Sequence, residues 1–306
     1  MASILITGGA GFIPSSVAEG LSKNPEHSIV LIDNLLTGKT SNIPAGNNVK
    51  FIKGDVNDMH AVTSIMAAYR FDYVFHYAAV VGVHRTLMYP SLVLKDMNGM
   101  YNVLECAKNT GVKRVFFSSS SEVYGEPVEV PQHEERTPLN SRLPYAVVKN
   151  VGECYCRTYK QDYDLDYTIF RFFNTYGPKQ SEDFVISKFL QAAREKKDIT
   201  LYGDGLQTRT FCYIDDNVEF TRKIMENELC INEVVNVGHD LQYTIKELAE
   251  AIIKVTGSSS KIVHLPPLKE GDMQRRQPDN SRMKEILGRD LLPLEEGLRK
   301  ILGTKK

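Results

Sequence analysis

Short apolar runs and longer amphipathic segments alternate through the first 172 residues of the chain. Runs rich in branched and aromatic residues predict β-strands at Ile4–Thr7, Ser28–Ile32, Val49–Lys53, Tyr73–His76, Val115–Ser118 and Thr168–Arg171. Segments with apolar residues at helical spacing predict helices near 14–23, 58–68, 91–110 and 144–162. Strands that alternate with helices are typical of βαβ units, so we predict an α/β fold built on a doubly wound parallel sheet.

The pattern changes after Phe172, where glycine and proline turn signals become frequent. Short helices are predicted near 183–196 and 244–256, and the strand-like segments Phe211–Ile214 and Val234–Val237 can return to the first domain. We therefore predict a larger domain at 1–174, to which 211–238 return. A smaller α/β C-terminal domain is predicted at 175–210 and 239–306.

A glycine-rich turn lies between the first predicted strand and the first predicted helix. Gly8 and Gly11 permit a tight turn and a close approach of the backbone to a pyrophosphate at the helix N-terminus. Asp33 follows Gly11 by 33 − 11 = 22 residues, where a carboxylate can accept hydrogen bonds from an adenosine ribose and would repel the 2′-phosphate of NADP. The larger domain is therefore predicted to be an NAD-binding Rossmann domain, although Asp33 could instead cap a helix or turn. Pro14 stands where such motifs usually have a third glycine.

Charge and composition exclude several classes of function. With 37 Lys+Arg and 38 Asp+Glu the net charge is −1, which creates no field to capture nucleic acid or an anionic membrane. The absence of a long apolar run or a leader pattern predicts a cytoplasmic protein. The spacing of the cysteines predicts reduced thiols rather than a metal site at Cys106, Cys154, Cys156, Cys212 and Cys230.

A serine-rich segment, Ser118–Ser121, follows the strand predicted at Val115–Ser118, and Tyr145 and Lys149 come further along the chain. On a helix, Tyr145 and Lys149 are four residues apart and share one face. A neighbouring ammonium favours the phenolate form, which would make Tyr145 a usable general base. A lone Tyr-x-x-x-Lys pair is weak evidence, but its position after a sheet strand in a predicted NAD domain favours a catalytic pair over a surface accident.

These motifs together resemble those of the extended short-chain dehydrogenases/reductases that act on nucleotide sugars, a family of epimerases, dehydratases and decarboxylases. The resemblance covers essentially the whole chain. The matching segments are 7–13, Asp33-Asn34, 54–56, 76–79, 120–125, Tyr145-x-x-x-Lys149, 171–178, 202–209 and 275–279.

The resemblance implies that Tyr145 takes the proton of a sugar hydroxyl, Ser120 orients that hydroxyl and Lys149 holds the nicotinamide ribose. It implies that Asp55 and Val56 face the adenine. The full set expected to bind NAD is Gly8, Gly11, Phe12, Ile13, Asp33, Asn34, Asp55, Val56, Ala78, Ala79, Tyr145 and Lys149.

The resemblance also implies a nucleotide-diphosphate site and a dimer. Asn174, Arg209 and Arg276 would bind the diphosphate, since the guanidinium fork suits phosphate oxygens. Alternatively, both arginines are solvated surface charges. The helices near 91–110 and 144–162 form a homodimer's four-helix bundle in the family, although their apolar residues could equally belong to the core.

The reaction depends on what happens at C5 of the sugar after C4 is oxidised. Glu122 discriminates here, because the segment Ser121–Gly125 resembles UDP-glucuronate decarboxylases and, more distantly, 4,6-dehydratases. The residue Ser121, where the dehydratases of dTDP-glucose have Asp, disfavours the dehydratases. The segment 272–279 also resembles the decarboxylases, whereas 78–85 resembles the epimerases.

Two roles stay open at this stage. His84 or Arg85 could pair with a uronate carboxylate or could be a solvated loop charge. Glu122 could act at C5 or could be a strand-end carboxylate that hydrogen-bonds to the backbone.

We therefore expect an NAD-dependent enzyme that oxidises C4 of a UDP-sugar through Tyr145. Decarboxylation of UDP-glucuronate through a 4-keto intermediate is the first candidate, and 4-epimerisation of UDP-glucuronate or UDP-glucose is the close alternative. A 4,6-dehydratase comes third. A non-catalytic NAD-binding regulator is disfavoured because Ser120, Tyr145 and Lys149 are all present.

Overall fold

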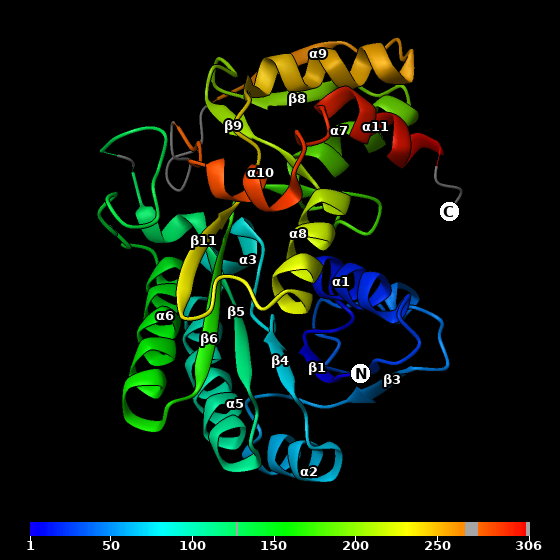
Figure 1. Cartoon of the computed structure of the whole chain (residues 1–306). Helices are drawn as coiled ribbons and strands as arrows, with labels where there is room; N and C mark the ends of the chain where they lie inside the picture. The colour runs from blue at the N-terminus through cyan, green and yellow to red at the C-terminus, as the bar shows by residue number, and fades with distance from the viewer. Residues whose placement is uncertain (127, 267–274, 304–306) are drawn as a thin grey trace. The chain divides into compact units, whose positions relative to one another are not determined.

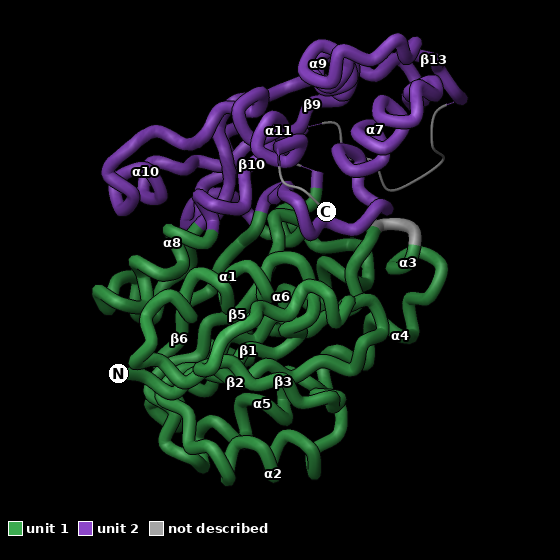
Figure 2. Tube along the Cα trace, turned by 90° about the vertical axis from the view of Figure 1, so that its right-hand side faces the viewer, with its two compact units in different colours: residues 1–125, 139–172, 218–235 green, residues 126–138, 173–217, 236–306 purple. Residues whose placement is uncertain are grey.

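The computed structural model describes residues 1–126, 128–266 and 275–303, without the side chains of Val83 and His84. Neighbouring residues form two compact units, which Figure 2 colours separately. Unit 1 comprises Met1–Gly125, Leu139–Phe172 and Val218–Val235, and unit 2 comprises Glu126–Pro138, Phe173–Asn217 and Asn236–Lys306. These units group residues that lie close in space, and they do not show which segments fold as independent domains. The domain boundaries predicted from the sequence therefore stay a prediction.

Most of unit 1 is a regular alternation of strands and helices. Its elements are β1 (Ser3–Thr7), α1 (Phe12–Ser22), β2 (Ser28–Asp33), η1 (Thr40–Asn42), β3 (Val49–Lys53), α2 (Met59–Tyr69), β4 (Tyr73–His76), α3 (Val83–Met88), α4 (Pro90–Leu94), α5 (Asp96–Thr110), β5 (Arg114–Ser120), η2 (Ser121–Tyr124), α6 (Pro144–Tyr163) and β6 (Asp166–Phe172). Two further elements start or end across the boundary between the units, namely α8 (Ile214–Glu226) and β11 (Glu233–Val237).

The central sheet has seven strands in the order β11-β6-β5-β4-β1-β2-β3 (Figure 1). Neighbouring strands from β1 to β6 run parallel, with Leu5 opposite Val30 and Ser119 opposite Arg171. This confirms the predicted doubly wound sheet. Because the strands are parallel, the carboxyl ends of β1, β2, β4 and β5 lie at one edge of the sheet, where ligands bind in such folds.

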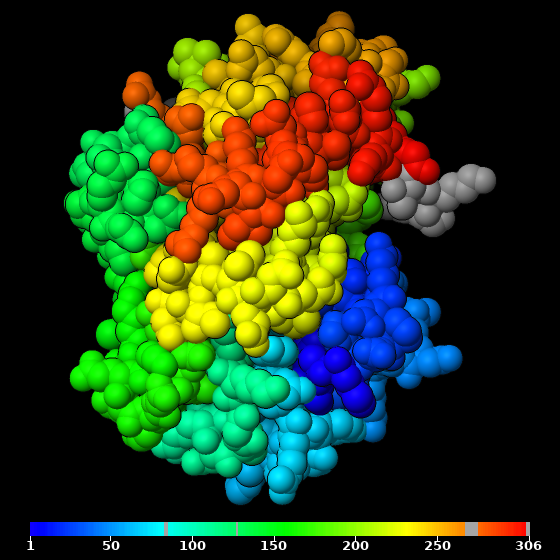
Figure 3. Space-filling model, viewed as in Figure 1, coloured from blue at the N-terminus to red at the C-terminus, as the bar shows by residue number. Residues whose placement is uncertain are grey.

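Apolar side chains pack against the central sheet in two groups. On one face, side chains of α2, α5 and α6 such as Met66, Val103 and Cys156 form the main core with the strands. A stack of aromatic rings crosses neighbouring strands, since Phe75 and Phe116 lie 4.3 Å apart and Phe116 and Phe170 lie 6.0 Å apart. Phe220 of α8 meets Phe170 edge-on, and α8 lies beside α1 in Figures 1 and 3.

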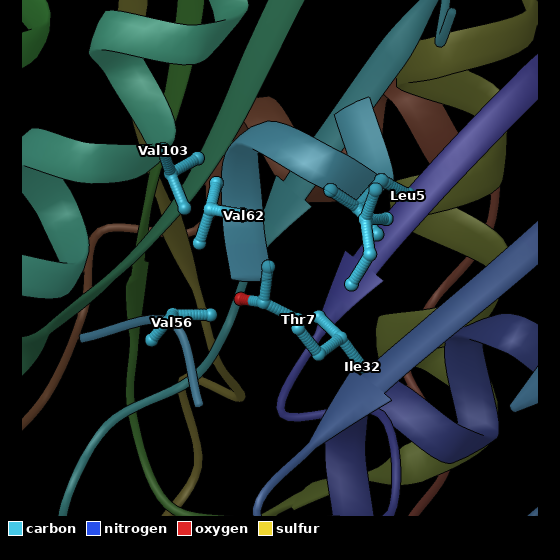
Figure 4. Close-up of a pocket in the computed structure, with 7 residues that line it drawn as sticks. Leu5, Thr7, Ile32, Val56, Val62 and Val103 are labelled. Carbon is cyan, nitrogen blue, oxygen red and sulfur yellow. The ribbon is translucent and has the colours of Figure 1, made fainter. Parts of the chain in front are cut away.

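A small apolar pocket lies in the core of unit 1 beside β1 and β2 (Figure 4). Aliphatic side chains line it together with Thr7. The hydroxyl oxygen of Thr7 accepts hydrogen bonds from the amides of Tyr77 and Ala78. The pocket is a packing gap between core side chains and offers no charged group to a nucleotide sugar.

Two predicted elements need correction. The strand predicted at Phe211–Ile214 is shorter, because Cys212–Tyr213 forms β10, which pairs with β7, and Ile214 begins α8. The return of this segment to the larger domain stays a prediction. The helix predicted at 91–110 is two helices, α4 and α5. At their junction the amide of Lys95 bonds to the carbonyl of Leu92, and the amide of Asn98 bonds to the carbonyl of Lys95, so the chain tightens to a three-residue spacing there.

Unit 2 is built from short strands and helices. Its elements are β7 (Thr175–Tyr176), α7 (Val185–Arg194), β8 (Ile199–Tyr202), β9 (Thr208–Thr210), β10 (Cys212–Tyr213), β12 (Gln242–Thr244), α9 (Ile245–Thr256), β13 (Ile262–Leu265), α10 (Ser281–Leu287) and α11 (Leu294–Gly303). The strands pair as β10 with β7, β12 with β9 and β13 with β8. Thr244 and Glu247 cap the start of α9 reciprocally, which explains why the helix begins there.

All five cysteines are free thiols. Among the described residues no helix combines the length and the apolar character needed to span a bilayer.

Candidate active site

Two glycines shape the turn between β1 and α1. Gly8 has a φ of 69°, and a Cβ there would lie 2.9 Å from Cα of Ala78, so no side chain fits. The amide of Gly11 donates to the carbonyl of Gly8 at 2.8 Å, and Gly11 is the N-cap residue of α1. Phe12 and Ile13 form the first helical turn, where amides have no acceptor within the helix and can hold a phosphate oxygen.

Pro14 is compatible with this turn. It is the third residue of α1 and is buried. An amide at that position would have no intrahelical acceptor, so the proline ring removes no hydrogen bond. A Cβ on Gly11 would lie 3.3 Å from Cγ of Pro14, which shows that the ring fills the space beside the turn. Close packing of α1 instead occurs at Gly20, where a Cβ would lie 2.4 Å from Cγ1 of Val218.

Asp33 ends β2 with its carboxylate buried. One oxygen accepts from the amide of Ala10 at 3.0 Å and the other from the amide of Leu35 at 2.7 Å. The turn-capping interpretation is therefore correct. Each oxygen keeps a second lone pair, so the predicted ribose contact is also compatible with this geometry.

Asn34 and Asp55 lie together at the same edge of the sheet. The amide group of Asn34 donates to Asp55 at 3.1 Å, and the other oxygen of Asp55 accepts from the amide of Asn57 at 2.8 Å. The carbonyl of Val56 accepts from Asn102 of α5 at 2.9 Å. These bonds hold the loop after β3, which is the loop expected to face the adenine.

The loop after β4 is tied to β1 through Thr7. Its hydroxyl oxygen accepts from the amides of Tyr77 at 3.1 Å and Ala78 at 3.0 Å, and lies 3.0 Å from Nδ1 of His76. Burial, with the charge of Lys149, lowers the pKa of His76 to about 3. The imidazole is therefore neutral and serves to hold the loop that contains Ala78 and Ala79.

Ser120 and Glu122 share the turn that leaves β5. The side-chain oxygen of Ser120 accepts from the amide of Glu122 at 3.2 Å, so Ser120 caps the short helix η2. Ser120 is buried and Glu122 is half-buried. The cap fixes the backbone of Glu122 relative to Ser120.

Tyr145 and Lys149 lie on α6, as the spacing predicts. The ammonium of Lys149 lies 5.7 Å from the centre of the Tyr145 ring and donates to the hydroxyl of Ser118 at 3.3 Å. Lys149 is buried, and burial lowers its pKa to about 8 against the opposing charge of Asp96. Tyr145 packs against Val80 and Val148. A buried ammonium therefore lies beside the half-buried ring of Tyr145.

Asp96 is a residue of this site that sequence reasoning missed. It begins α5, and its carboxylate accepts from the amide of Val80 at 2.8 Å. Burial raises its pKa to about 6, while the Val80 amide and the charge of Lys149 oppose the shift. An acidic residue in the first turn of a helix is common, so nothing in the sequence marked this one as the counter-charge of Lys149.

The remaining predicted substrate residue of unit 1 with a described side chain is Arg85. Its guanidinium donates to the carbonyl of Val81 at 2.9 Å. The side chain of His84 and the segment 267–274, which includes Asp272, lie outside the described residues.

Three predicted substrate residues belong to unit 2. The amide group of Asn174 donates to the carbonyl of Thr210 at 3.2 Å, and the guanidinium of Arg209 donates to the carbonyl of Thr208 at 2.7 Å. Arg276 is only 9% exposed, which excludes its interpretation as a solvated surface charge. Arg209 is half-buried.

Comparison with known proteins identifies the family. Residues 4–238 match the model of the NAD dependent epimerase/dehydratase family. The chain belongs to this family. The expected resemblance is therefore confirmed, and the protein is an NAD-dependent enzyme that modifies nucleotide sugars.

Individual relatives include both decarboxylases and 4-epimerases. The chain is 38% identical over 304 residues to a UDP-N-acetyl-alpha-D-glucosaminuronate decarboxylase of Bacillus cytotoxicus, covering 92% of this chain and 90% of that protein. It is 33% identical over 310 residues to UDP-glucuronic acid decarboxylase 1 of Danio rerio, covering 98% of this chain and 71% of that protein. The structure of a UDP-glucose 4-epimerase of Thermotoga maritima, solved with UDP-glucose, superposes with a TM-score of 0.92 at 33% identity, covering 98% of this chain and 97% of that chain.

The residues present fit the cofactor of this epimerase/dehydratase family. A Cβ at Gly8 would lie 2.9 Å from Cα of Ala78, and one at Gly11 would be tight against the carbonyl oxygen of Gly8 at 3.0 Å. The amides of Phe12 and Ile13 lie free of helical acceptors. Asp33 offers a carboxylate where an unphosphorylated ribose is expected. When bound, NAD would supply a reversible acceptor for hydride.

Proposed function

We propose that this enzyme decarboxylates a UDP-linked uronic acid, with UDP-glucuronate as the first substrate to test. The observation that carries the proposal is Glu122, a carboxylate held two residues after Ser120 on η2. Helix α6, with Tyr145 and Lys149, packs against the same short helix. Two relatives with this proposed activity act on uronates, and both cover more than nine-tenths of the chain.

The first step would be proton removal from the hydroxyl at C4. Tyr145 would take this proton, with Ser120 orienting the hydroxyl. The nearby ammonium of Lys149, 5.7 Å from the Tyr145 ring, favours the phenolate. Loss of the hydride to the cofactor at the same carbon then leaves a 4-keto sugar.

The second step follows from the chemistry of that ketone. A carboxylate on C5 is β to the C4 carbonyl, so the bond between C5 and the carboxyl carbon breaks, CO₂ leaves, and the electron pair is held as an enolate. C5 then needs a proton, which Glu122 would deliver or direct through a water. Return of the hydride to C4, with the proton from Tyr145, completes the product and restores the cofactor.

The test is incubation of the NAD-loaded enzyme with UDP-glucuronate and, separately, with UDP-N-acetylglucosaminuronate and UDP-glucose. We expect one of the uronates to lose the mass of CO₂, and released CO₂ to match the product in amount.

Tyr145→Phe should lower turnover by about 10³-fold without loss of NAD binding, whereas Glu122→Gln should block product formation but leave C4 oxidation visible as NADH absorbance. A product of unchanged mass from any of the three sugars would contradict decarboxylation.

The second candidate is 4-epimerisation. The observation that favours it is the similarity to a structure of a UDP-glucose 4-epimerase, at a TM-score of 0.92. An epimerase needs Tyr145 and rotation of the keto sugar but no proton donor at C5. The candidate predicts an isomer of unchanged mass and a product profile that Glu122→Gln leaves intact.

We also propose that the enzyme is a homodimer of cytoplasmic location. The support is two apolar side chains that point away from the core of unit 1, Tyr101 of α5 at 44% exposure and Val147 of α6 at 38%. The two helices are in contact, and exposed apolar side chains on neighbouring helices can belong to a protein–protein interface. The five free thiols are compatible with a reducing compartment.

A further inference from the structure

Helix α6 carries a third polar residue in line with Tyr145 and Lys149. Glu153 lies one helical turn after Lys149, and its side chain has no exposed surface. Arg171 of β6 is 2% exposed. Two charges buried this deeply need close partners, because each loses its hydration.

The two charges meet in a forked ion pair. Nε of Arg171 donates to one oxygen of Glu153 at 2.8 Å, and Nη2 donates to the other oxygen at 2.8 Å. The hydroxyl of Ser119 donates to the first of these oxygens at 2.7 Å. Ser119 and Arg171 are opposite one another in β5 and β6, so the carboxylate of Glu153 fastens α6 to both strands.

The other end of Arg171 reaches η2. Nη1 donates to the hydroxyl of Tyr124 at 2.9 Å, and the guanidinium carbon lies 4.8 Å from the centre of that ring. Tyr124 is buried and is the last residue of η2, the short helix that Ser120 caps and that contains Glu122. Arg171 is therefore the link between the helix with Tyr145 and Lys149 and the turn with Ser120 and Glu122.

Stability alone does not account for this arrangement. A buried ion pair contributes little net stability compared with an apolar pair of the same volume, since the desolvation cost is large. Burial disfavours ionisation of Glu153, but the hydrogen bonds and charge of Arg171 outweigh it and hold the pKa of Glu153 below its usual value. Both partners of the ion pair therefore stay charged. Their directional hydrogen bonds fix the distances between β6, α6 and η2 more strictly than apolar contacts would.

We propose that Arg171, Glu153 and Tyr124 are positioning residues that set the separation between Ser120 and Glu122 on η2 and Tyr145 and Lys149 on α6. The proposal rests on the proposed catalytic roles of those four residues. A displacement of one reacting group by about 1 Å can cost about 10²-fold in rate. Loss of the link should therefore act on turnover more than on substrate binding.

The main variant is Tyr124→Phe, which removes one hydroxyl and keeps the ion pair. We expect its kcat to fall by about 10-fold to 100-fold with KM within about threefold of the wild-type value. The lost buried hydrogen bond should lower the thermal midpoint by only a few degrees, so the enzyme stays folded at the assay temperature. The double variant Arg171→Met/Glu153→Leu replaces the pair by apolar side chains, so it avoids an uncompensated buried charge and should show the same loss of kcat. Arg171→Lys keeps the charge without the fork and should recover only part of the rate.

The matched control is Arg157→Ala. Arg157 donates to Glu153 at 3.0 Å but is 43% exposed, and the bond of this network to Tyr124 comes from Arg171 instead. Its removal should leave kcat unchanged. A Tyr124→Phe enzyme with wild-type kcat, or a double variant that binds NAD and turns over normally, would overturn the proposal.

A second readout separates this proposal from the proposed function. In NAD-loaded protein labelled with ¹³C in tyrosine, the Tyr145 signal is assigned by its loss in Tyr145→Phe. Tyr124→Phe should shift or broaden that signal, whereas Arg157→Ala should not. If wild-type enzyme acts on no UDP-sugar, the proposed function fails while this spectrum still tests the positioning. An unchanged Tyr145 signal in Tyr124→Phe contradicts the positioning role whatever the substrate.

Discussion

At the scale of single residues, the charges of Lys149 and Asp96 set the electrostatic environment of Tyr145. Lys149 donates to Ser118 at 3.3 Å, and burial lowers its pKa to about 8. The charge of Asp96 opposes that shift, and Asp96 itself is anchored to the amide of Val80 at 2.8 Å. The ammonium that favours the Tyr145 phenolate therefore depends on a carboxylate about 50 residues away in sequence.

Asp96→Asn should change how the thermal stability depends on pH. Burial raises the pKa of Asp96 to about 6, above its usual 3.8, so the folded state holds the proton more tightly than the unfolded state between these values. The stability that protonation contributes is present at low pH and is lost as pH rises through 6. Asn cannot ionise, so the variant should have a higher thermal midpoint than the wild type at pH 8 and little advantage at pH 4.

Asp96→Asn should also change the dependence of kcat on pH. Without the opposing charge, the pKa of Lys149 falls further below about 8, so the alkaline limb of kcat should move to lower pH. Asp162→Asn is the control, because Asp162 makes the same charge change at an exposed position of α6. Identical pH profiles for Asp96→Asn and wild type would refute the counter-charge role.

At the scale of elements, the spacing between α6 and β5 depends on the absence of a side chain. A Cβ on Gly152 would lie 2.3 Å from Cζ of Phe117, which is buried in the core. The strand and the helix that provide Ser120, Tyr145 and Lys149 therefore approach closely at this glycine. A sequence pattern shows a glycine in a helix but does not show which ring it meets.

Gly152→Ala should consequently weaken both fold and catalysis. The methyl group forces the Phe117 ring or α6 to move, and overpacking of this kind costs about 1–3 kcal/mol, more than the helix propensity that alanine adds. Urea unfolding should show a lower free energy of unfolding, and kcat should fall because Tyr145 moves with α6. Cys154→Ala, on the exposed side of the same helix, should change neither quantity. A Gly152→Ala enzyme as stable as the wild type would show that the helix and strand can separate freely.

At the scale of the whole molecule, the family assignment rests on segments spread over most of the chain. The match to the family model runs from residue 4 to residue 238, and the relatives cover more than nine-tenths of the chain. Neither measure selects decarboxylation over epimerisation, since both activities occur among the relatives. We therefore expect side chains that face C5 of the bound sugar to decide between the two reactions, and Glu122 is the first candidate to test.

Sedimentation velocity tests the homodimer. One chain has a mass of 34.5 kDa, and we expect a single species of about twice that mass. Tyr101→Asp would place a charge on the apolar face of α5 and should shift the species to monomer, whereas Tyr163→Asp at the end of α6 serves as a comparison, since Tyr163 is 52% exposed beside Lys108. A wild-type monomer at micromolar concentration would contradict the assembly.

Much of the architecture follows from the sequence by itself. Strand and helix periods depend on local side-chain burial, so the alternation of elements, the parallel sheet and the glycine turn at Gly8 and Gly11 could all be predicted. The i, i+4 spacing likewise predicts that Lys149 lies beside Tyr145 on one helix face. The break at Lys95 could not be predicted, because it depends on local hydrogen bonds at three-residue spacing that the apolar pattern does not reveal. The length of the strand within Phe211–Ile214 could not be predicted either, because it depends on pairing with β7.

Only the tertiary structure decided which buried groups surround those residues. The charge of Asp96 acts on the pKa of Lys149, and Arg171 joins Glu153 to Tyr124, because the fold brings together segments that are distant in sequence. Burial makes such groups matter, since a charge without water depends on its few neighbours. Pro14 illustrates the same distinction: it is a departure from a motif in the sequence, and in the fold it is a buried residue of a first helical turn that needs no amide.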